Sequence, residues 1–216
     1  MRIDVWSDVV CPWCYIGKRR LETAVAGFAY RAELEIRWRA FELDPHAPPE
    51  RPGDPARRVA AKYGISVEQA RRGHQRLTDL AAAEGLAYRL EDTRGGNTFD
   101  AHRLIKLGGE RGLADAVEER LMAGYLCQGR PIGDPSTVAA LAVEAGLGAT
   151  EVEEVLAGGR FSAEVRADEE EAAERGITGV PFFLVDGRFG IPGAQEPDTI
   201  LALLGRAWER RQERSA

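Results

Sequence analysis

Cysteine is scarce in this chain, with three residues among 216. That number is too small for a scaffold held together by several disulfides, and too small for a zinc site made of four cysteines. The other candidate metal ligands are Cys127, His46, His74 and His102. They follow no ligand spacing, so we predict no metal site. Two of the three cysteines nevertheless share one motif, Cys11-Pro12-Trp13-Cys14. The motif has three possible explanations: a redox pair, half of a zinc site, or two inert buried side chains.

Long apolar runs and lysine are also lacking. No stretch of 18 apolar residues exists, so we predict no membrane span. The basic residues are 26 arginines and only 3 lysines, and the net charge of −6 argues against general binding to nucleic acid or to a membrane surface. Met1 leads directly into an expected strand without a charged and then apolar leader, so we expect a cytoplasmic protein. A structural disulfide is unusual in that compartment, which favours a catalytic or sensing role for the motif.

The motif lies between an expected strand and an expected helix. Arg2 to Ser7 alternates apolar and polar residues, as a strand does. A helical pattern begins at Pro12, which suits a first helical turn. Cys11 is then at the N-cap, where unpaired backbone N–H groups and the helix dipole favour a thiolate. Because Cys14 follows one turn later, we expect Cys11 to be the exposed, attacking thiol and Cys14 the shielded, resolving thiol.

A second group of signals is found far along the chain, from Gly176 to Gly187. Phe182 to Val185 is typical of a strand, and Asp186-Gly187 indicates a hairpin turn. Pro181 would occupy the first position of that strand, where the missing N–H group is tolerated. On its own, Pro181 is explained as a strand-initiating proline.

The remaining elements follow from periodicity and capping signals. We expect a second strand from Glu33 to Phe41, an exit from the sheet in the proline-rich stretch 44–55, and then helices for more than a hundred residues. The helix boundaries are expected at the capping boxes Ser66/Gln69 and Thr150/Glu153, at Asp134-Pro135, and at the stops Gly85, Gly146 and Gly158-Gly159. The last elements expected are a short strand from Arg188 to Ile191 and a helix from Pro197 to Arg211.

The run from Asp8 to Lys18 resembles the DsbA-like thioredoxin family, specifically its leaderless FrnE-type branch. Further matches, in family order, are Phe41-Glu42-Leu43, Asn97-Thr98 with Ala101-His102-Arg103, Gly176 to Pro181, and Gly193-Ala194-Gln195. The resemblance implies an α/β, thioredoxin-like fold with a large all-helical insertion. We place the discontinuous thioredoxin-like domain at 1–45 and 177–216, and the helical insertion at 46–176. The resemblance also implies a cis peptide bond between Val180 and Pro181.

The resemblance implies that Cys11 and Cys14 are the catalytic residues. The residues expected to bind substrate are Pro12, Trp13, Val180, Pro181, His102 and Gln195. Three positions have competing explanations: Asp8 as a proton acceptor or a loop carboxylate, His102 as part of the site wall or a structural histidine, and Gln195 as a substrate contact or part of a turn. Outside the site, we interpret Cys127 as a buried small apolar side chain, and the acidic run Asp168 to Glu171 as a solvated helix face.

One position departs from the family's periplasmic oxidant, which carries histidine where this chain has Trp13. Tryptophan supplies no imidazolium charge to stabilise the Cys11 thiolate, so we expect a less oxidising disulfide. Its ring offers a flat apolar surface for a substrate instead.

Three functions remain open on the sequence. The first is a thiol–disulfide oxidoreductase, acting as a reductase or isomerase on a disulfide-containing protein or a small thiol substrate. The second is a glutathione-dependent isomerase or transferase of the hydroxychromene-carboxylate isomerase type, whose relatives usually carry serine where Cys11 stands. The third is a non-catalytic holdase. We expect no bound cofactor, with glutathione as a co-substrate at most, and a monomer or homodimer.

Overall fold

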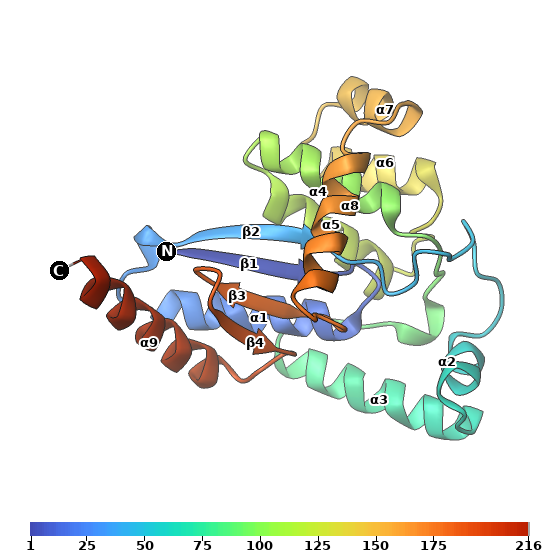
Figure 1. The fold of residues 1–216 in the computed structure, drawn as a ribbon. Helices are drawn as coiled ribbons and strands as arrows, with labels where there is room; N and C mark the ends of the chain where they lie inside the picture. Colours follow the sequence, from blue (N-terminus) through green and yellow to red (C-terminus); the bar gives the residue numbers. More distant parts are fainter. Residues whose placement is uncertain (216) are drawn as a thin grey trace.

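The computed structural model describes residues 1–215 and contains a four-stranded sheet of order β2-β1-β3-β4 (Figure 1). The strands are β1 (Arg2–Ser7), β2 (Glu35–Ala40), β3 (Phe182–Val185) and β4 (Phe189–Pro192). β1 and β2 are parallel, whereas β3 is antiparallel to both of its neighbours. The chain therefore enters the sheet twice, at its beginning and near its end.

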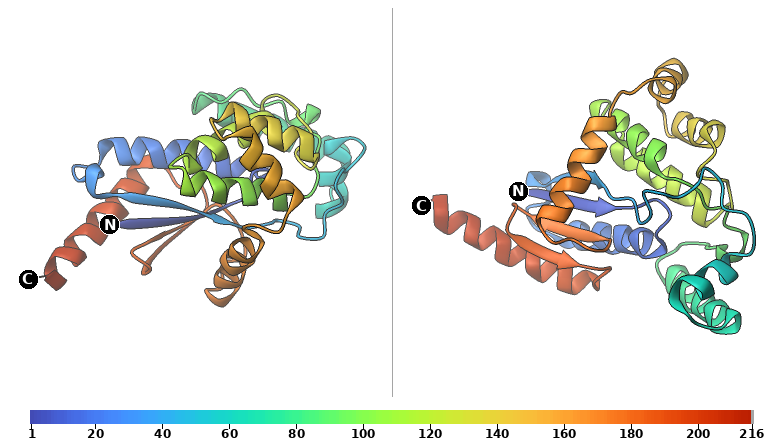
Figure 2. Two further views of the ribbon diagram at one scale, coloured as in Figure 1. Left: turned by 90° about the horizontal axis from the view of Figure 1, so that it is seen from above. Right: turned by 45° about the vertical axis from the view of Figure 1, so that its right-hand side comes forward.

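Helices cover both faces of the sheet (Figure 2). Ile3 and Val5 of β1 pack into the main core with α1 (Pro12–Gly27) and α9 (Pro197–Ser215). Trp6 points to the other face, where it packs against Ala172 of α8 (Ser162–Glu174). The alternation in β1 is thus real, but its polar-looking face is covered by α8 rather than exposed to solvent.

The insertion between β2 and β3 is helical. Its helices are α2 (Pro55–Tyr63), α3 (Val67–Ala83), α4 (Phe99–Glu110), α5 (Ala114–Leu126), α6 (Pro135–Glu144), α7 (Ala149–Ala157) and α8. α2 and α3 form a hairpin at one end of the molecule, and α4 to α7 pack against one another, with α5 in contact with β2 (Figure 1). The expected α/β fold with a helical insertion is confirmed, while the residue boundaries of the two domains stay a prediction. Within residues 1–215, no helix has the length and apolar character needed to cross a membrane.

Most local signals are confirmed by the structure. Ser66 and Gln69 form both hydrogen bonds of a capping box, and Asp134 caps α6 with Pro135 at its start. Asp186 and Gly187 both have positive φ angles in the turn between β3 and β4. The prediction of a capping box at Thr150 and Glu153 is wrong, because α7 begins at Ala149 after Gly148 and has no side-chain cap.

Several boundaries differ from the expected ones. β2 begins at Glu35 rather than Glu33, because Arg31–Glu33 forms a single 3-10 turn before the strand. β2 also ends at Ala40, and β4 is shifted by one residue to Phe189–Pro192. α9 continues to Ser215, beyond the expected end.

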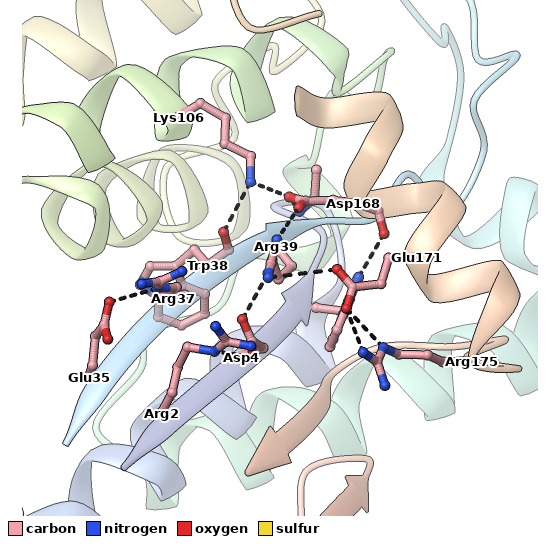
Figure 3. Close-up of polar contacts among 12 residues, drawn as sticks. Arg2, Asp4, Glu35, Arg37, Trp38, Arg39, Lys106, Asp168, Glu171 and Arg175 are labelled. Atoms are coloured by element: carbon pink, nitrogen blue, oxygen red, sulfur yellow. Dashed lines mark hydrogen bonds and ion pairs between the residues drawn. The ribbon is translucent and has the colours of Figure 1, made fainter. Parts of the chain in front are cut away.

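Asp168 contradicts the expectation of a solvated acidic face on α8, because its side chain is buried. Its carboxylate pairs with Arg39 at 2.8 Å, pairs with Lys106 and accepts a hydrogen bond from the Ala40 N–H (Figure 3). Its backbone carbonyl accepts a hydrogen bond from the Trp6 indole at 2.9 Å. The acidic run looks solvated in sequence because the basic residues that neutralise Asp168 come from β2 and α4.

Candidate functional site

The Cys11-Pro12-Trp13-Cys14 motif forms the N-terminal turn of α1. Cys11 is the N-cap residue in extended conformation, and Pro12 opens the helix. The Cys11 N–H donates to the Asp8 carbonyl, and the Cys14 N–H donates to the Cys11 carbonyl, each at 3.0 Å. No side-chain hydrogen bond caps the N-terminus of this helix.

Cys11 is less accessible than expected, with only 5% of its surface exposed against 2% for Cys14. The expectation of an exposed Cys11 is therefore wrong in degree, although Cys11 is the cysteine of the pair that lines the cavity described below. It is covered because its Sγ lies 3.6 Å from the Val180 carbonyl oxygen, to which the thiol donates. Burial and the neighbouring Cys11 sulfur raise the pKa of Cys14 well above its ordinary value. Cys14 is thus the thiol that needs help to ionise.

The loop before β3 closes over the motif. The peptide bond between Val180 and Pro181 is cis. The Pro181 carbonyl accepts a 2.8 Å hydrogen bond from Gly193, which adopts a positive φ angle of 73° after β4. On the helix side, Gly17 of α1 leaves room for the Pro181 ring: a Cβ atom built on Gly17 would lie 2.8 Å from Pro181 Cγ.

A cavity of about 840 Å³ opens beside Cys11 and is bounded by the α2–α3 hairpin. Its apolar wall includes Trp13, Leu43, Val59, Tyr63, Ile65, Leu77, Leu80 and Val180. Its basic side chains are Arg51, Arg58, Lys62, His74 and Arg76, and its acidic ones are Asp8 and Asp44. Asp44 is paired with Arg51. The cavity wall is thus largely apolar and carries more basic than acidic side chains, although the chain as a whole has a net charge of −6.

Asp8 and His102 lie together in the interior. The Asp8 carboxylate accepts a 2.8 Å hydrogen bond from the Leu43 N–H and lies 3.6 Å from His102 Nε2. Nε2 has no hydrogen-bond partner among the described residues. Burial alone would lower the pKa of His102, but Asp8, Glu118 and Glu42 outweigh that effect and hold the pKa above its ordinary value.

Glu118 of α5 completes this interior group. It is 1% exposed, and its Oε1 accepts a 2.7 Å hydrogen bond from the Ser7 hydroxyl. Ser7, the last residue of β1, acts to lower the pKa of Cys14, but burial and the Cys11 sulfur outweigh it. Burial raises the pKa of Glu118 to about 7, although His102, the Ser7 hydrogen bond and Lys18 act in the opposite direction.

The predicted site residues fall into two groups. Pro12, Trp13 and Val180 line the cavity with Cys11 and Asp8. The other four, Cys14 among them, do not line it. His102 is buried behind Asp8, Pro181 packs against Gly17, and Gln195 donates to the Pro192 carbonyl at 2.8 Å.

Cys127 lies outside the cavity lining at the C-cap of α5. It is half-buried against the core rather than fully buried, which partly corrects the interpretation of this residue.

Three residues near the motif are absent from the sequence-based prediction. Ser7 and Glu118 were missed because they meet only through the fold, 111 positions apart. Tyr88 was missed for the same reason: its hydroxyl donates to the Pro12 carbonyl at 2.6 Å, and its ring stacks on Tyr15. The signal available for Glu118 was a glutamate at a position on the buried face of α5, where an apolar residue is expected.

The raised pKa of Glu118 predicts how stability depends on pH. Folding raises this pKa from 4.5 to about 7, so the folded protein holds the proton more tightly than the unfolded chain. Stability should therefore fall as the pH rises from about 4.5 to about 7, by on the order of 2 kcal/mol. His102 acts in the same direction above its unfolded pKa, since its folded pKa is also raised.

Urea unfolding at closely spaced pH values measures this dependence. Glu118→Gln should flatten the curve between pH 5 and pH 7 and should leave the slope below pH 4 unchanged. A wild-type curve that rises across this window would contradict the assignment.

Comparison with known proteins identifies the family. Residues 2–205 match the DSBA-like thioredoxin domain. The chain is similar to the crystal structure of a probable DsbA oxidoreductase, SCO1869 of Streptomyces coelicolor, with 45% identity, a TM-score of 0.93, and coverage of 97% of this chain and 90% of that one. It is 27% identical over 210 residues to the uncharacterized protein YwbO of Bacillus subtilis (strain 168), covering 92% of each.

A more distant structure shares the fold. The cytosolic disulfide reductase DsbM from Pseudomonas aeruginosa with GSH is 19% identical, with a TM-score of 0.65 and coverage of 97% of this chain and 100% of that chain. The sheet, the helical insertion and the Cys11/Cys14 turn agree with the family match over nearly the whole length. The chain belongs to the family of DSBA-like thioredoxin domains.

Proposed function

We propose that this protein is a thiol–disulfide oxidoreductase of the FrnE type that works as a reductase or isomerase. The observation that carries the proposal is the position of Cys11: an N-cap residue of α1 that lines the cavity, with Cys14 one turn behind it. That arrangement supplies an attacking thiolate on the substrate side and a resolving thiol on the protein side.

The reaction follows from this geometry. The Cys11 thiolate attacks one sulfur of a substrate disulfide, and the other substrate sulfur leaves with the bonding electron pair. Cys14 then attacks the Cys11 sulfur of the mixed disulfide, which releases the second substrate thiol and forms the Cys11–Cys14 disulfide. Two electrons pass to the substrate, so the protein must be reduced again by a thiol of the cell.

The cavity favours a particular kind of substrate. Trp13 is 43% exposed and offers an apolar surface beside Cys11, while Lys62 and Arg76 bring positive charge to the cavity wall. A disulfide that joins apolar and acidic groups fits these two features. Because Trp13 provides no imidazolium and a reducing cytoplasm would keep the pair as a dithiol, reduction or isomerisation is favoured over net oxidation.

Glutathione-dependent chemistry is the second candidate. The basic cavity supports it, because glutathione carries two carboxylates and one free thiol. The presence of Cys11 and Cys14 as a pair favours the first candidate, since a site that only stabilises bound glutathione thiolate does not need a resolving cysteine.

The distinguishing experiment is insulin reduction with dithiothreitol or glutathione as the electron source. The wild type should accelerate the reaction and Cys11→Ser should not. If Cys11→Ser instead conjugates or isomerises a substrate in the presence of glutathione, the second candidate is correct. If wild type and Cys11→Ser bind unfolded chains equally and neither reduces insulin, the protein is a holdase.

Gly17→Ala tests the contact between α1 and the loop before β3. The added Cβ would lie 2.8 Å from Pro181 Cγ and 3.4 Å from Phe183 Cζ, so the loop must move away from Cys11. We expect insulin reduction to slow about tenfold and stability to fall by about 1–3 kcal/mol, as overpacked sites do.

Gly27→Ala, in the last turn of α1, is the matched control. Its Cβ would meet Leu201 at 3.5 Å, which is an ordinary contact. Both substitutions replace a glycine of α1 with alanine, and the gain in helix propensity is greater at Gly17, in the helix interior, so propensity alone would favour Gly17→Ala. If the two variants are equally active and equally stable, Gly17 does not hold the loop in register.

A further inference from the structure

β2 is an outer strand of the sheet, with β1 on one side and no strand on the other. The Glu35 N–H donates to the Met1 carbonyl at 2.9 Å, so Glu35 and every second residue after it bond to β1. In a parallel ladder, the residues between them turn their backbone N–H and C=O groups away from the neighbouring strand. The residues of β2 that present these groups at the outer edge are Ile36, Trp38 and Ala40.

The helical insertion covers this edge only at its carboxyl end. The Ala40 N–H donates to the Asp168 carboxylate at 2.8 Å, and the Trp38 carbonyl accepts from Lys106 Nζ at 3.4 Å (Figure 3). At the amino end, the Ile36 N–H and C=O have no hydrogen-bond partner within residues 1–215. An edge with free backbone groups is a template on which another strand can pair.

The open end of β2 has a particular pattern of side chains. Glu35, Ile36 and Arg37 are all exposed, and Ile36 is 38% exposed. Because side chains alternate along a strand, Ile36 points to one face of the sheet and the two charges point to the other, where they pair at 2.6 Å. An edge with charges of one sign would repel a copy of itself. This edge carries one charge of each sign, so a strand of the same sequence can match it.

The charges select one register for two copies of β2. In an antiparallel pair with Ile36 opposite Ile36 of the second copy, Glu35 faces Arg37 on both sides. A pair centred on Glu35 would place two glutamates opposite each other, and a pair centred on Arg37 would place two arginines opposite each other, which is destabilising. The register centred on Ile36 also lets the two copies exchange both N–H···O=C bonds of that residue, since these groups point outward.

We propose that this protein forms a two-fold symmetric dimer in which the β2 strands of two copies pair antiparallel about Ile36. The two four-stranded sheets then become one continuous sheet, and the same surface serves both copies. The contact consists of the backbone bonds of Ile36, its side-chain contact with Ile36 of the second copy, and two Glu35–Arg37 pairs between the chains. Because few residues take part, the association is reversible and increases with protein concentration.

Pairing at this end of β2 leaves both cavities open. β1 and β2 are parallel, and the Cys11-Pro12-Trp13-Cys14 motif follows the carboxyl end of β1. The open part of β2 is its amino end, which lies toward the opposite end of the sheet (Figure 1). The dimer therefore has two separate sites, and its formation does not depend on the proposed function.

Sedimentation velocity under reducing conditions, over a range of protein concentrations, tests the dimer and its register. The wild type should pass from monomer to dimer as the concentration rises. Glu35→Arg and Arg37→Glu should each weaken self-association at least about tenfold, since each variant places like charges opposite each other twice in the dimer. The double variant Glu35→Arg/Arg37→Glu restores opposite charges and should dimerise like the wild type.

A mixture of the two single variants tests the same contact between different chains. The two arginines of Glu35→Arg would face the two glutamates of Arg37→Glu, so the mixture should form a heterodimer, which is detected when only one of the two is fluorescently labelled. Glu153→Arg, at an exposed position of α7, is the matched charge-reversal control and should dimerise like the wild type. Circular dichroism spectra equal to that of the wild type show that the variants are folded.

Three results would overturn the proposal: a wild type that stays monomeric at every concentration, an Arg37→Glu variant that dimerises as well as the wild type, or a mixture that forms no heterodimer. Insulin reduction by the same samples keeps this inference apart from the proposed function. Dimerisation without insulin reduction would support the interface and contradict the oxidoreductase, and insulin reduction by a protein that stays monomeric would do the reverse.

Discussion

Replacing Cys14 with serine is expected to arrest the protein as a mixed disulfide with its substrate on Cys11. Cys11 keeps its place at the N-terminus of α1 and its access to the cavity, so the attack on the substrate proceeds. The shielded thiol that would release the substrate is gone. Insulin reduction should fall at least about 1000-fold, equivalent to about 4 kcal/mol in the barrier.

Intact-protein mass spectrometry under non-reducing conditions checks this expectation. Cys14→Ser should carry one substrate thiol per chain, and dithiothreitol should remove it. Cys11→Ser should carry none, and Cys127→Ser should turn over like the wild type, because Cys127 lies outside the cavity lining. An adduct on Cys11→Ser, or full turnover by Cys14→Ser, would mean that Cys11 is not the attacking residue or that Cys14 does not resolve.

The part of the site that lies within one stretch of chain was predictable from the sequence. The motif, its strand, its helix and the role of Pro12 at the start of α1 depend on neighbours in sequence, where spacing carries the information. The turn at Asp186-Gly187 was predictable for the same reason, since two consecutive positive φ angles favour this pair of residues.

The interior side of the site was not predictable from spacing. Ser7 meets Glu118 across 111 positions, and Tyr88 reaches Pro12 across 76. Each partner alone is an ordinary polar residue, and its chemistry appears only when the insertion packs beside α1. The same limit explains the error at Asp168, whose basic partners lie 129 and 62 positions away.

The accessibility of Cys11 was overestimated for a related reason. Position at a helix N-terminus predicts the polarity around a sulfur but not what covers it. The cover is the Val180 carbonyl, which is 169 positions away in the chain. The cysteine is therefore screened by the same loop that forms one edge of the cavity. In the proposed reaction a substrate would therefore reach Cys11 from the cavity side, where Trp13 is exposed.

Asp168→Ala is expected to cost about 4 kcal/mol of folding stability, within the range for breaking a buried ion pair. The substitution removes the carboxylate that holds Arg39, Lys106 and the Ala40 N–H between β2, α4 and α8 (Figure 3). Arg39 keeps Asp4 as a partner at 2.9 Å. Lys106 keeps a 3.4 Å contact with the Trp38 carbonyl, which does not neutralise its charge, so the larger part of the cost falls on Lys106.

Three further variants separate the causes in urea unfolding experiments. Asp168→Asn keeps an oxygen for the Ala40 N–H and loses the charge, so it should cost less than Asp168→Ala. Adding Lys106→Met to Asp168→Ala should recover part of the loss, because it removes the unpaired ammonium group. Glu170→Ala, on the exposed side of the same helix, should change stability by less than about 0.5 kcal/mol. If Asp168→Ala cost no more than Glu170→Ala, α8 would be held to the sheet by Trp6, Ala172 and Leu184 alone, and the ion pairs would contribute nothing measurable.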